Sequence, residues 1–393
     1  MHGIVPYLNT APPSGSLASV SAEVPNIGMT YSERGKWRGG GGVSFCGAIH
    51  PYDDPRVTHK FQVVNGKNYH YVHGAPTGNV RGTFLCLHGF PDLWYGYRFI
   101  IPFILERGFR VIVPDMLGFG QTDAPRVPPA DISAYSMKNV AADMIELLKL
   151  LNVPKVILFG HDWYYLLYLF LAYRHSSTNL SAKLQGLSDS VEDIPLQQRD
   201  SIPYCQLREY IPIRELVATK VPSFKYQIAF QDPQTEKDTE APGKVRQFLK
   251  GLHRAPGDEA ANLMVEKDIV ESVGDLKRGR FMTEEDLDYY TKEYERNGFH
   301  GPLNWYKTRK VNYEDEKDLP FEGFKVPCLF LGAKYDIATP PSMAESQKHS
   351  IPHLTARLMD TGHWALLEDP ETAIGHVSEW IDAVVLGGGE SNI

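Results

Sequence analysis

The chain has 393 residues, 42% of them hydrophobic, and a formal net charge of −8 at pH 7. A chain of this length and composition can bury one large globular core together with an inserted lobe. The acidic balance and the lack of a block rich in Lys and Arg argue against nucleic acid or an anionic membrane surface as the main partner. Since the sequence has no apolar run of about 18 residues and no signal-peptide layout, we expect a cytoplasmic protein without membrane insertion.

The four cysteines are scattered along the chain, at Cys46, Cys86, Cys205 and Cys328. Cys86 and Cys328 lie inside apolar runs that are typical of buried strands. Because the spacing matches neither a disulfide framework nor a metal site, we expect reduced thiols in the core.

Residues 1 to about 55 are rich in Gly, Ser and Pro and show no sustained hydrophobic period. Such a composition predicts an N-terminal extension that is disordered or only loosely attached. From His59 onward, apolar and polar residues alternate on both sides of Asn65-Gly66. Because Asn-Gly favours a type I′ turn, this alternation predicts a β-hairpin at the start of the folded domain.

Beyond residue 83 the pattern predicts strands that alternate with helices. Strands are expected at residues 83–87, 111–113, 156–159, 326–332 and 355–359, and helices at residues 94–106, 135–151 and 370–385, with a short helix after Pro341. Alternation of this kind predicts a mostly parallel, doubly wound sheet. Between about residues 205 and 320 the alternation stops and Tyr, Lys, Glu and Asp are frequent, which favours a helical lid inserted into the sheet domain.

Residues 155–163 are the most informative stretch of the sequence. A short apolar run ends at Gly160, Asp162 follows, and a helix-like apolar run begins at Leu166. A strand, a sharp turn and a helix with a reactive residue at the apex form a nucleophile elbow, which here carries Asp162 in place of the usual serine. The alternative interpretation is that Asp162 only caps the helix, as Asp often does.

Two further residues complete a catalytic order. Asp336 follows the strand predicted at residues 326–332, and His363 follows the next strand. A nucleophile, an acid and a histidine in this order are typical of α/β-hydrolases, whose sites lie at the carboxyl ends of the strands. Each residue alone is a weak signal, but together Asp162, Asp336 and His363 favour a catalytic triad.

With these residues in place, the chain resembles the soluble epoxide hydrolases of the α/β-hydrolase superfamily. The resemblance covers about residues 56–163 and 202–385, and it rests on His88-Gly89-Phe90-Pro91, residues 115–120, Gly160-His161-Asp162-Trp163, Asp336 and Thr361-Gly362-His363-Trp364. In the lid, residues 224–227 and 301–306 are similar to the two segments that carry the family's ring-opening tyrosines.

The resemblance implies an α/β-hydrolase fold with a helical cap domain inserted after the sixth strand. It divides the chain into an extension (residues 1–55), a core (residues 56–204 and 320–393, of which 164–201 is atypical) and a cap (residues 205–319). We expect a monomer or homodimer that takes a small epoxide and water as reactants, without a metal or an organic cofactor.

The chemistry of an aspartate nucleophile agrees with this family. Carboxylate attack on an ester would form a mixed anhydride, whereas attack on a saturated carbon forms a stable alkyl ester on Asp162. In the implied site, Tyr226 and Tyr306 donate hydrogen bonds to the epoxide oxygen, and His363 with Asp336 activates water. The resemblance also implies an oxyanion hole formed by the backbone N–H groups of Phe90 and Trp163 and a cis peptide bond before Pro91. Gln227, Trp305 and Trp364 are expected to bind substrate.

The sequence departs from the family in one segment. Tyr164 and Tyr165 stand where the family has small residues, which would strain the elbow. Residues 176–201 are polar and contain Gly186 and Pro195, so one sheet strand is predicted to be missing and residues 164–201 to be a replaced segment.

Two alternatives to an active epoxide hydrolase stay open. A haloalkane dehalogenase shares the Asp-Asp-His core, but Phe90 and the cap tyrosines disfavour it. A ligand-binding homologue with impaired catalysis is the other alternative, and the pair Tyr164-Tyr165 supports it.

Overall fold

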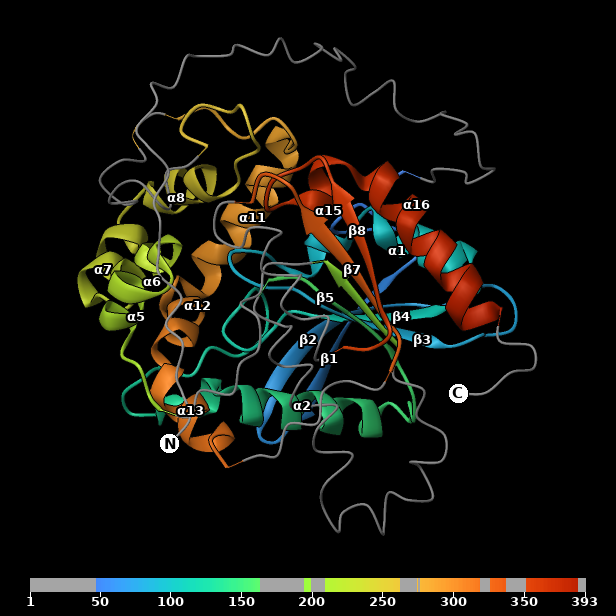
Figure 1. Cartoon of the computed structure of the whole chain (residues 1–393), viewed down its shortest axis with the longest axis horizontal. Coiled ribbons are helices and arrows are strands. Elements are labelled where there is room, and N and C mark those ends of the chain that lie inside the picture. Colours follow the sequence, from blue (N-terminus) through green and yellow to red (C-terminus); the bar gives the residue numbers. More distant parts are fainter. Residues whose placement is uncertain are drawn as a thin grey trace, which may run out of the picture.

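An eight-stranded sheet forms the centre of the computed structural model, which describes residues 47–162, 194–198, 209–261, 274, 276–318, 326–336 and 351–387 (Figure 1). The strand order is β1-β2-β4-β3-β5-β6-β7-β8. The strands are β1 (Thr58–Val64), β2 (Lys67–Gly74), β3 (Thr83–Leu87), β4 (Arg110–Pro114), β5 (Ile157–Gly160), β6 (Ile194–Gln198), β7 (Cys328–Ala333) and β8 (Leu354–Met359). Strand β2 pairs antiparallel with β1 and β4, and all other pairs are parallel, which confirms the predicted sheet.

The first two strands form the predicted hairpin. Val64 pairs with Lys67, and the two residues between them have positive φ angles, 48° for Asn65 and 79° for Gly66. A type I′ turn requires positive φ at both central positions, so the structure confirms the turn that Asn-Gly predicts.

The packed domain begins earlier than predicted. Ile49 is only 1% exposed, and its N–H donates to the carbonyl oxygen of Arg98 at 2.9 Å. The prediction of a loose extension to residue 55 is therefore wrong for residues 47–55, because the buried Ile49 side chain and its backbone hydrogen bond attach this segment to the core. Residues 1–46 lie outside the described residues.

Helices cover both faces of the sheet. In Figure 1, α1 and α16 lie beside each other on one face and α2 lies on the other. The bounds are α1 (Ile100–Glu106), α2 (Met137–Leu150), α15 (Ala365–Glu368) and α16 (Pro370–Trp380). The helix predicted at residues 94–106 is divided into a 3-10 turn, η2 (Trp94–Tyr97), and α1. The closing helix predicted to residue 385 changes at Ile381 into a π-helical turn, η6 (Ile381–Leu386).

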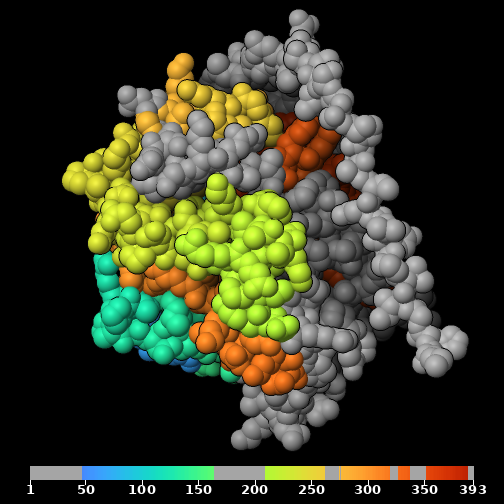
Figure 2. Space-filling view, turned by 60° about the vertical axis from the view of Figure 1, so that its left-hand side comes forward, coloured from blue at the N-terminus to red at the C-terminus, as the bar shows by residue number. Residues whose placement is uncertain are grey.

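Between β6 and β7 the described chain is helical, as the lid prediction requires. The helices of this predicted lid, the cap helices, are α5 (Ile213–Thr219), η4 (Pro222–Lys225), α6 (Tyr226–Phe230), α7 (Pro233–Glu240), α8 (Lys244–Leu252), α11 (Glu284–Asn297), α12 (His300–Asn304), η5 (Trp305–Lys307) and α13 (Arg309–Glu316). They gather at one side of the sheet, the side that faces the viewer in Figure 2. The domain boundaries predicted near residues 205 and 319 lie outside the described residues.

Backbone contact brings the cap helices against the core. The Cα of Gly118, in the loop after β4, is so close to Gly301 of α12 that an added Cβ on either residue would clash with the other's backbone. The indole N–H of Trp305 donates to the Leu117 carbonyl oxygen at 3.0 Å. Only glycine allows two backbones to approach in this way. Gly118 and Gly301 are therefore both needed for the cap helices to pack against the core.

Strand β6 corrects the prediction of a missing strand. Ile194–Gln198 pairs parallel with β5 on one side and with β7 on the other. The edges of β5 and β7 carry backbone groups that need hydrogen-bond partners, and any extended segment can supply them whatever its side chains. The polarity of residues 176–201 was therefore no evidence that the strand is absent.

Cys86 and Cys328 are buried free thiols, as predicted, and burial raises the pKa of the Cys86 thiol. Cys46 and Cys205 lie outside the described residues. Within the described ranges, no helix has the length and apolar character to cross a membrane. The same ranges contain no group of three or more His, Cys, Asp or Glu side chains that could hold a metal ion.

Candidate active site

Asp162 occupies a sharp turn directly after the buried strand β5. Its φ angle is 63°, in the left-handed region that a non-glycine residue occupies at a cost of roughly 1–3 kcal/mol. The N–H of Phe90 donates to Asp162 Oδ1 at 2.7 Å. A turn of this kind after a buried strand is the geometry expected of a nucleophile elbow, and here the backbone N–H of Phe90 holds one carboxylate oxygen of Asp162.

The loop that supplies this N–H approaches Asp162 very closely. A Cβ added to Gly89 would overlap both Oδ1 and Cβ of Asp162. The next peptide bond, Phe90–Pro91, is cis, as the resemblance implies. Gly89 is therefore required for the backbone of this loop to reach the carboxylate.

Replacing Gly89 by alanine should lower kcat/KM by about a hundredfold, because a displacement of roughly 1 Å at the reacting group costs that much. The change should be measured together with the melting temperature, to separate displacement of Asp162 from loss of folding. Gly78→Ala is the matched control, since its added Cβ would meet no atom within 4 Å. Normal activity in a folded Gly89→Ala protein would contradict the assigned geometry.

His363 and Asp336 come together at the carboxyl ends of neighbouring strands, as predicted. Asp336 follows β7 and is 4% exposed, and its Oδ2 lies 3.3 Å from Nδ1 of the half-buried His363. Burial lowers the pKa of His363, but the hydrogen bond to Asp336 and the charges of Asp336, Asp162 and Glu368 more than offset it, so the pKa is raised. With Nδ1–H directed at Asp336, Nε2 is the nitrogen that can accept a proton.

The two predicted tyrosines lie beside each other in the cap. The ring centroids of Tyr226 and Tyr306 are 6.1 Å apart, and the ring centroid of Tyr306 lies 5.4 Å from that of Phe90. Burial and the charge of Asp162 raise the pKa of the Tyr226 phenol, against a smaller lowering by a hydrogen bond to Gln227. Tyr226 therefore keeps its proton at neutral pH and can donate it in a hydrogen bond near Asp162.

The predicted substrate-binding residues have structural contacts of their own. Gln227 is buried, with Nε2 at 3.4 Å from the Tyr226 hydroxyl oxygen. The indole N–H of Trp364 donates to the Leu252 carbonyl oxygen at 3.0 Å, and Trp305 contacts the core loop as described above. Their contact with substrate stays a prediction. Trp163, Tyr164 and Tyr165 lie outside the described residues.

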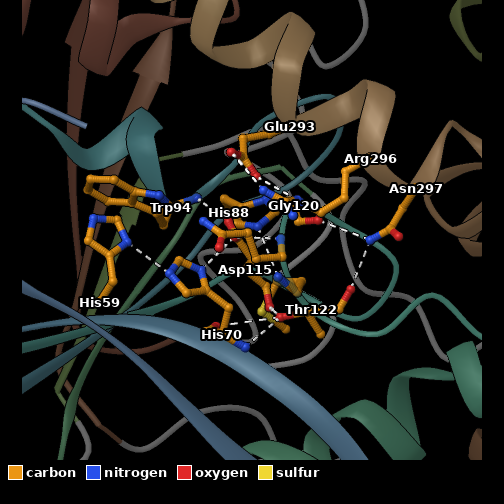
Figure 3. A network of polar contacts seen from close by, with 12 residues as sticks. His59, His70, His88, Trp94, Asp115, Gly120, Thr122, Glu293, Arg296 and Asn297 are labelled. Carbon is orange, nitrogen blue, oxygen red and sulfur yellow. Dashed lines mark hydrogen bonds and ion pairs between the residues drawn. The ribbon is translucent and has the colours of Figure 1, made fainter. Parts of the chain in front are cut away.

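A buried polar network supports the loops around the site (Figure 3). Asp115, after β4, accepts hydrogen bonds from the ring of His70 at 2.7 Å and from the Trp94 N–H at 3.1 Å. The His88 ring accepts from the Met116 N–H at 3.0 Å. A hydrogen bond from the Met116 backbone N–H to the His88 side chain thus joins two sequence motifs, residues 88–91 and 115–120, which explains why a polar side chain is buried there.

Three further polar residues near His363 were not predicted as part of the site. His161 Nε2 lies 3.2 Å from the His363 carbonyl oxygen, and Asp92 Oδ2 lies 3.7 Å from His161 Nδ1. Glu368 accepts backbone N–H groups on both sides of His363. His161 belongs to a motif quoted from the sequence and Asp92 directly follows another, but only the folded chain shows that Asp92 contacts His161 and that His161 contacts His363.

Comparison with known proteins agrees with this geometry. The family profile described as the alpha/beta hydrolase fold matches residues 82–177. Mutants of the epoxide hydrolases of potato and Vigna radiata superpose on the chain with TM-scores of 0.67 and 0.66 at 25% and 26% identity. Each alignment covers 83% of this chain and 99% of the known structure. The chain therefore has the α/β-hydrolase fold.

Sequence relatives identify the family within the α/β-hydrolase fold. An epoxide hydrolase from Neurospora crassa is 31% identical over 357 residues, which cover 85% of this chain and 98% of that protein. The chain belongs to the epoxide hydrolase family. The bifunctional epoxide hydrolase 2 of Rattus norvegicus is 28% identical, and the alignment covers 83% of this chain but 55% of that longer protein. The chain thus spans about half the length of the bifunctional relatives.

Proposed function

We propose that the protein hydrolyses epoxides to vicinal diols through an alkyl ester on Asp162. The observation that carries the proposal is the elbow itself, in which a carboxylate stands where serine hydrolases have a hydroxyl and is held at 2.7 Å by the Phe90 N–H. Such a carboxylate suits displacement at a saturated carbon.

In the first half-reaction, Asp162 Oδ2 attacks an epoxide carbon and the carbon–oxygen bond of the ring breaks. The leaving oxygen gains negative charge, and hydrogen bonds from Tyr226 and Tyr306 stabilise that charge. One of the two phenols transfers its proton to the alkoxide. The products are a neutral ester on Asp162 and a hydroxyl group on the neighbouring carbon.

In the second half-reaction, water attacks the carbonyl carbon of the ester while His363 Nε2 takes its proton. Asp336 orients the imidazole and stabilises the imidazolium that forms. The oxyanion forms at Oδ1, where the Phe90 N–H already donates, and the N–H of Trp163 is proposed as the second donor. Collapse of this intermediate expels the diol oxygen, which takes the proton from His363. The proton left on the Asp162 carboxyl group returns to the tyrosinate formed in the first half-reaction, so the carboxylate and both phenols are restored.

We further propose that the cap, residues 205–319, acts as a lid that carries the two proton donors. The contact of Tyr306 with Phe90 and the influence of Asp162 on Tyr226 support this division of the chain. When a lid carries catalytic groups, closure of the lid brings those groups to the substrate.

An isotope experiment tests the ester. Excess purified protein should be mixed with an aryl or alkyl epoxide in water enriched in heavy oxygen, so that each molecule turns over once. We expect an unlabelled diol and one heavy oxygen atom in the peptide that contains Asp162, because water attacks the ester carbonyl. Heavy oxygen in the diol after one turnover would show direct attack of water on the epoxide and would contradict the proposal.

The same protein should be offered haloalkanes of matched size. Two phenols that donate protons to a developing alkoxide give little help to a departing halide, so we expect diol formation from epoxides and negligible halide release. Halide release without epoxide turnover would instead favour the dehalogenase interpretation. Binding of epoxides without turnover would favour an impaired homologue.

A further inference from the structure

The carboxylate of Glu368 bridges the two backbone N–H groups that flank the proposed base. The N–H of Gly362 donates to Glu368 Oε2 at 2.9 Å, and the N–H of Trp364 donates to Oε1 at 3.1 Å. Glu368 is the last residue of the short helix α15, five positions after His363. Charge-assisted bonds of this kind are roughly twice as strong as neutral ones, so the pair restrains the backbone on both sides of the histidine.

We propose that Glu368 is a positioning residue that holds His363 for the attack of water on the ester. The inference rests on the proposed ester mechanism, in which His363 acts only in the second half-reaction. Loss of Glu368 should therefore slow hydrolysis of the ester and leave its formation unchanged.

Other contacts act on the same loop. A Cβ added to Gly362 would lie 3.1 Å from Glu368 Oε1 and 2.8 Å from Pro256 Cδ, so the carboxylate and the cap press directly on the backbone here. The ring of His363 reaches Asp336 at 3.3 Å, and its carbonyl oxygen reaches His161 at 3.2 Å. Asp336 restrains the ring, whereas Glu368 restrains the peptide bonds that carry it.

The charge of Glu368 also acts on the base. Burial raises the pKa of Glu368 to about 7, although the two backbone hydrogen bonds and the charges of Arg280 and His363 lower it. In return, Glu368 is one of the carboxylates, with Asp336 and Asp162, that raise the pKa of His363. Removal of this charge should shift the acidic limb of ester hydrolysis to lower pH, because His363 then loses its proton more easily.

The experiment separates the two half-reactions in Glu368→Gln and Glu368→Ala. Ester formation and decay should be followed in single turnovers with a reactive epoxide. The glutamine keeps one acceptor oxygen, whereas its amide nitrogen cannot accept the second N–H. We expect decay to slow about tenfold in Glu368→Gln and about a hundredfold in Glu368→Ala, with ester formation within about twofold of wild type. Glu371→Ala, which removes an exposed carboxylate on the neighbouring helix α16, is the matched control.

The same contacts also tie helix α15 to the loop before it, so a purely structural role is the competing explanation. Equal slowing of both half-reactions, or a Glu368→Gln protein that does not fold, would assign Glu368 to stability and overturn the inference. Wild-type decay in both variants would overturn it as well. A wild-type protein that forms no ester would instead reject the proposed function, so the two failures are distinguishable.

Discussion

Replacing both Tyr226 and Tyr306 by phenylalanine should nearly abolish epoxide opening. The two rings lie 6.1 Å apart in the cap, and each phenol can donate a hydrogen bond to the oxygen that leaves the epoxide carbon. Loss of one donor to a developing oxyanion typically costs about a hundredfold or more in rate, and loss of both leaves the alkoxide without a partner. We expect the double variant to be slower by at least about ten thousandfold.

Each single variant should keep partial activity, because the remaining phenol still stabilises the charge. The rate of ester formation should be measured in single turnovers, since the tyrosines act before hydrolysis. Tyr313→Phe, a change of the same type on the cap helix α13, should behave as wild type. An active, folded double variant would show that other groups protonate the epoxide oxygen.

The sequence predicted those parts of the fold that local chemistry determines. The hairpin follows from Asn65-Gly66, because few other dipeptides accept two positive φ angles. Strand β3 follows from four consecutive apolar residues, 84–87, all of which are buried. Strand β6 could not be predicted in this way, since it forms by pairing with β5 and β7, which are distant in the sequence. Likewise, no local pattern showed that Ile49 packs on the core.

The site residues also differ in whether local sequence pattern or the folded chain reveals them. Asp162, Asp336 and His363 were found because each stands at the end of a strand in a fixed chain order. Gly89 stood in a quoted motif, but its role depends on a distance to Asp162 that no spacing reveals. Glu368 escaped notice because, within the described residues, the groups that donate hydrogen bonds to it are backbone N–H groups, which carry no side-chain signature in the sequence.

Changing His363 to glutamine should arrest the reaction at the ester. A carboxylate is already ionised at neutral pH, so Asp162 needs no base to attack the epoxide, whereas water does need one. Mass spectrometry of the variant after incubation with a reactive epoxide should show one substrate adduct on the peptide with Asp162. The adduct should be absent from the Asp162→Asn variant. Normal steady-state turnover in His363→Gln, or an adduct that persists without Asp162, would contradict the assignment.

Formation of the ester on Asp162 should also change the pKa of His363, the base that activates water for its hydrolysis. In the free protein, burial lowers the pKa of His363, and the larger combined effect of nearby carboxylates, among them Asp336 and Asp162, raises it. Ester formation removes that negative charge, so the pKa of His363 should fall and the imidazole should lose its proton at the step that requires a neutral base. In wild type, the acidic limb of ester decay after a pH jump should therefore lie below the pH at which His363 titrates in the free protein. NMR titration of the imidazole gives that second value, and coincidence of the two would show that Asp162 and His363 are not electrostatically coupled.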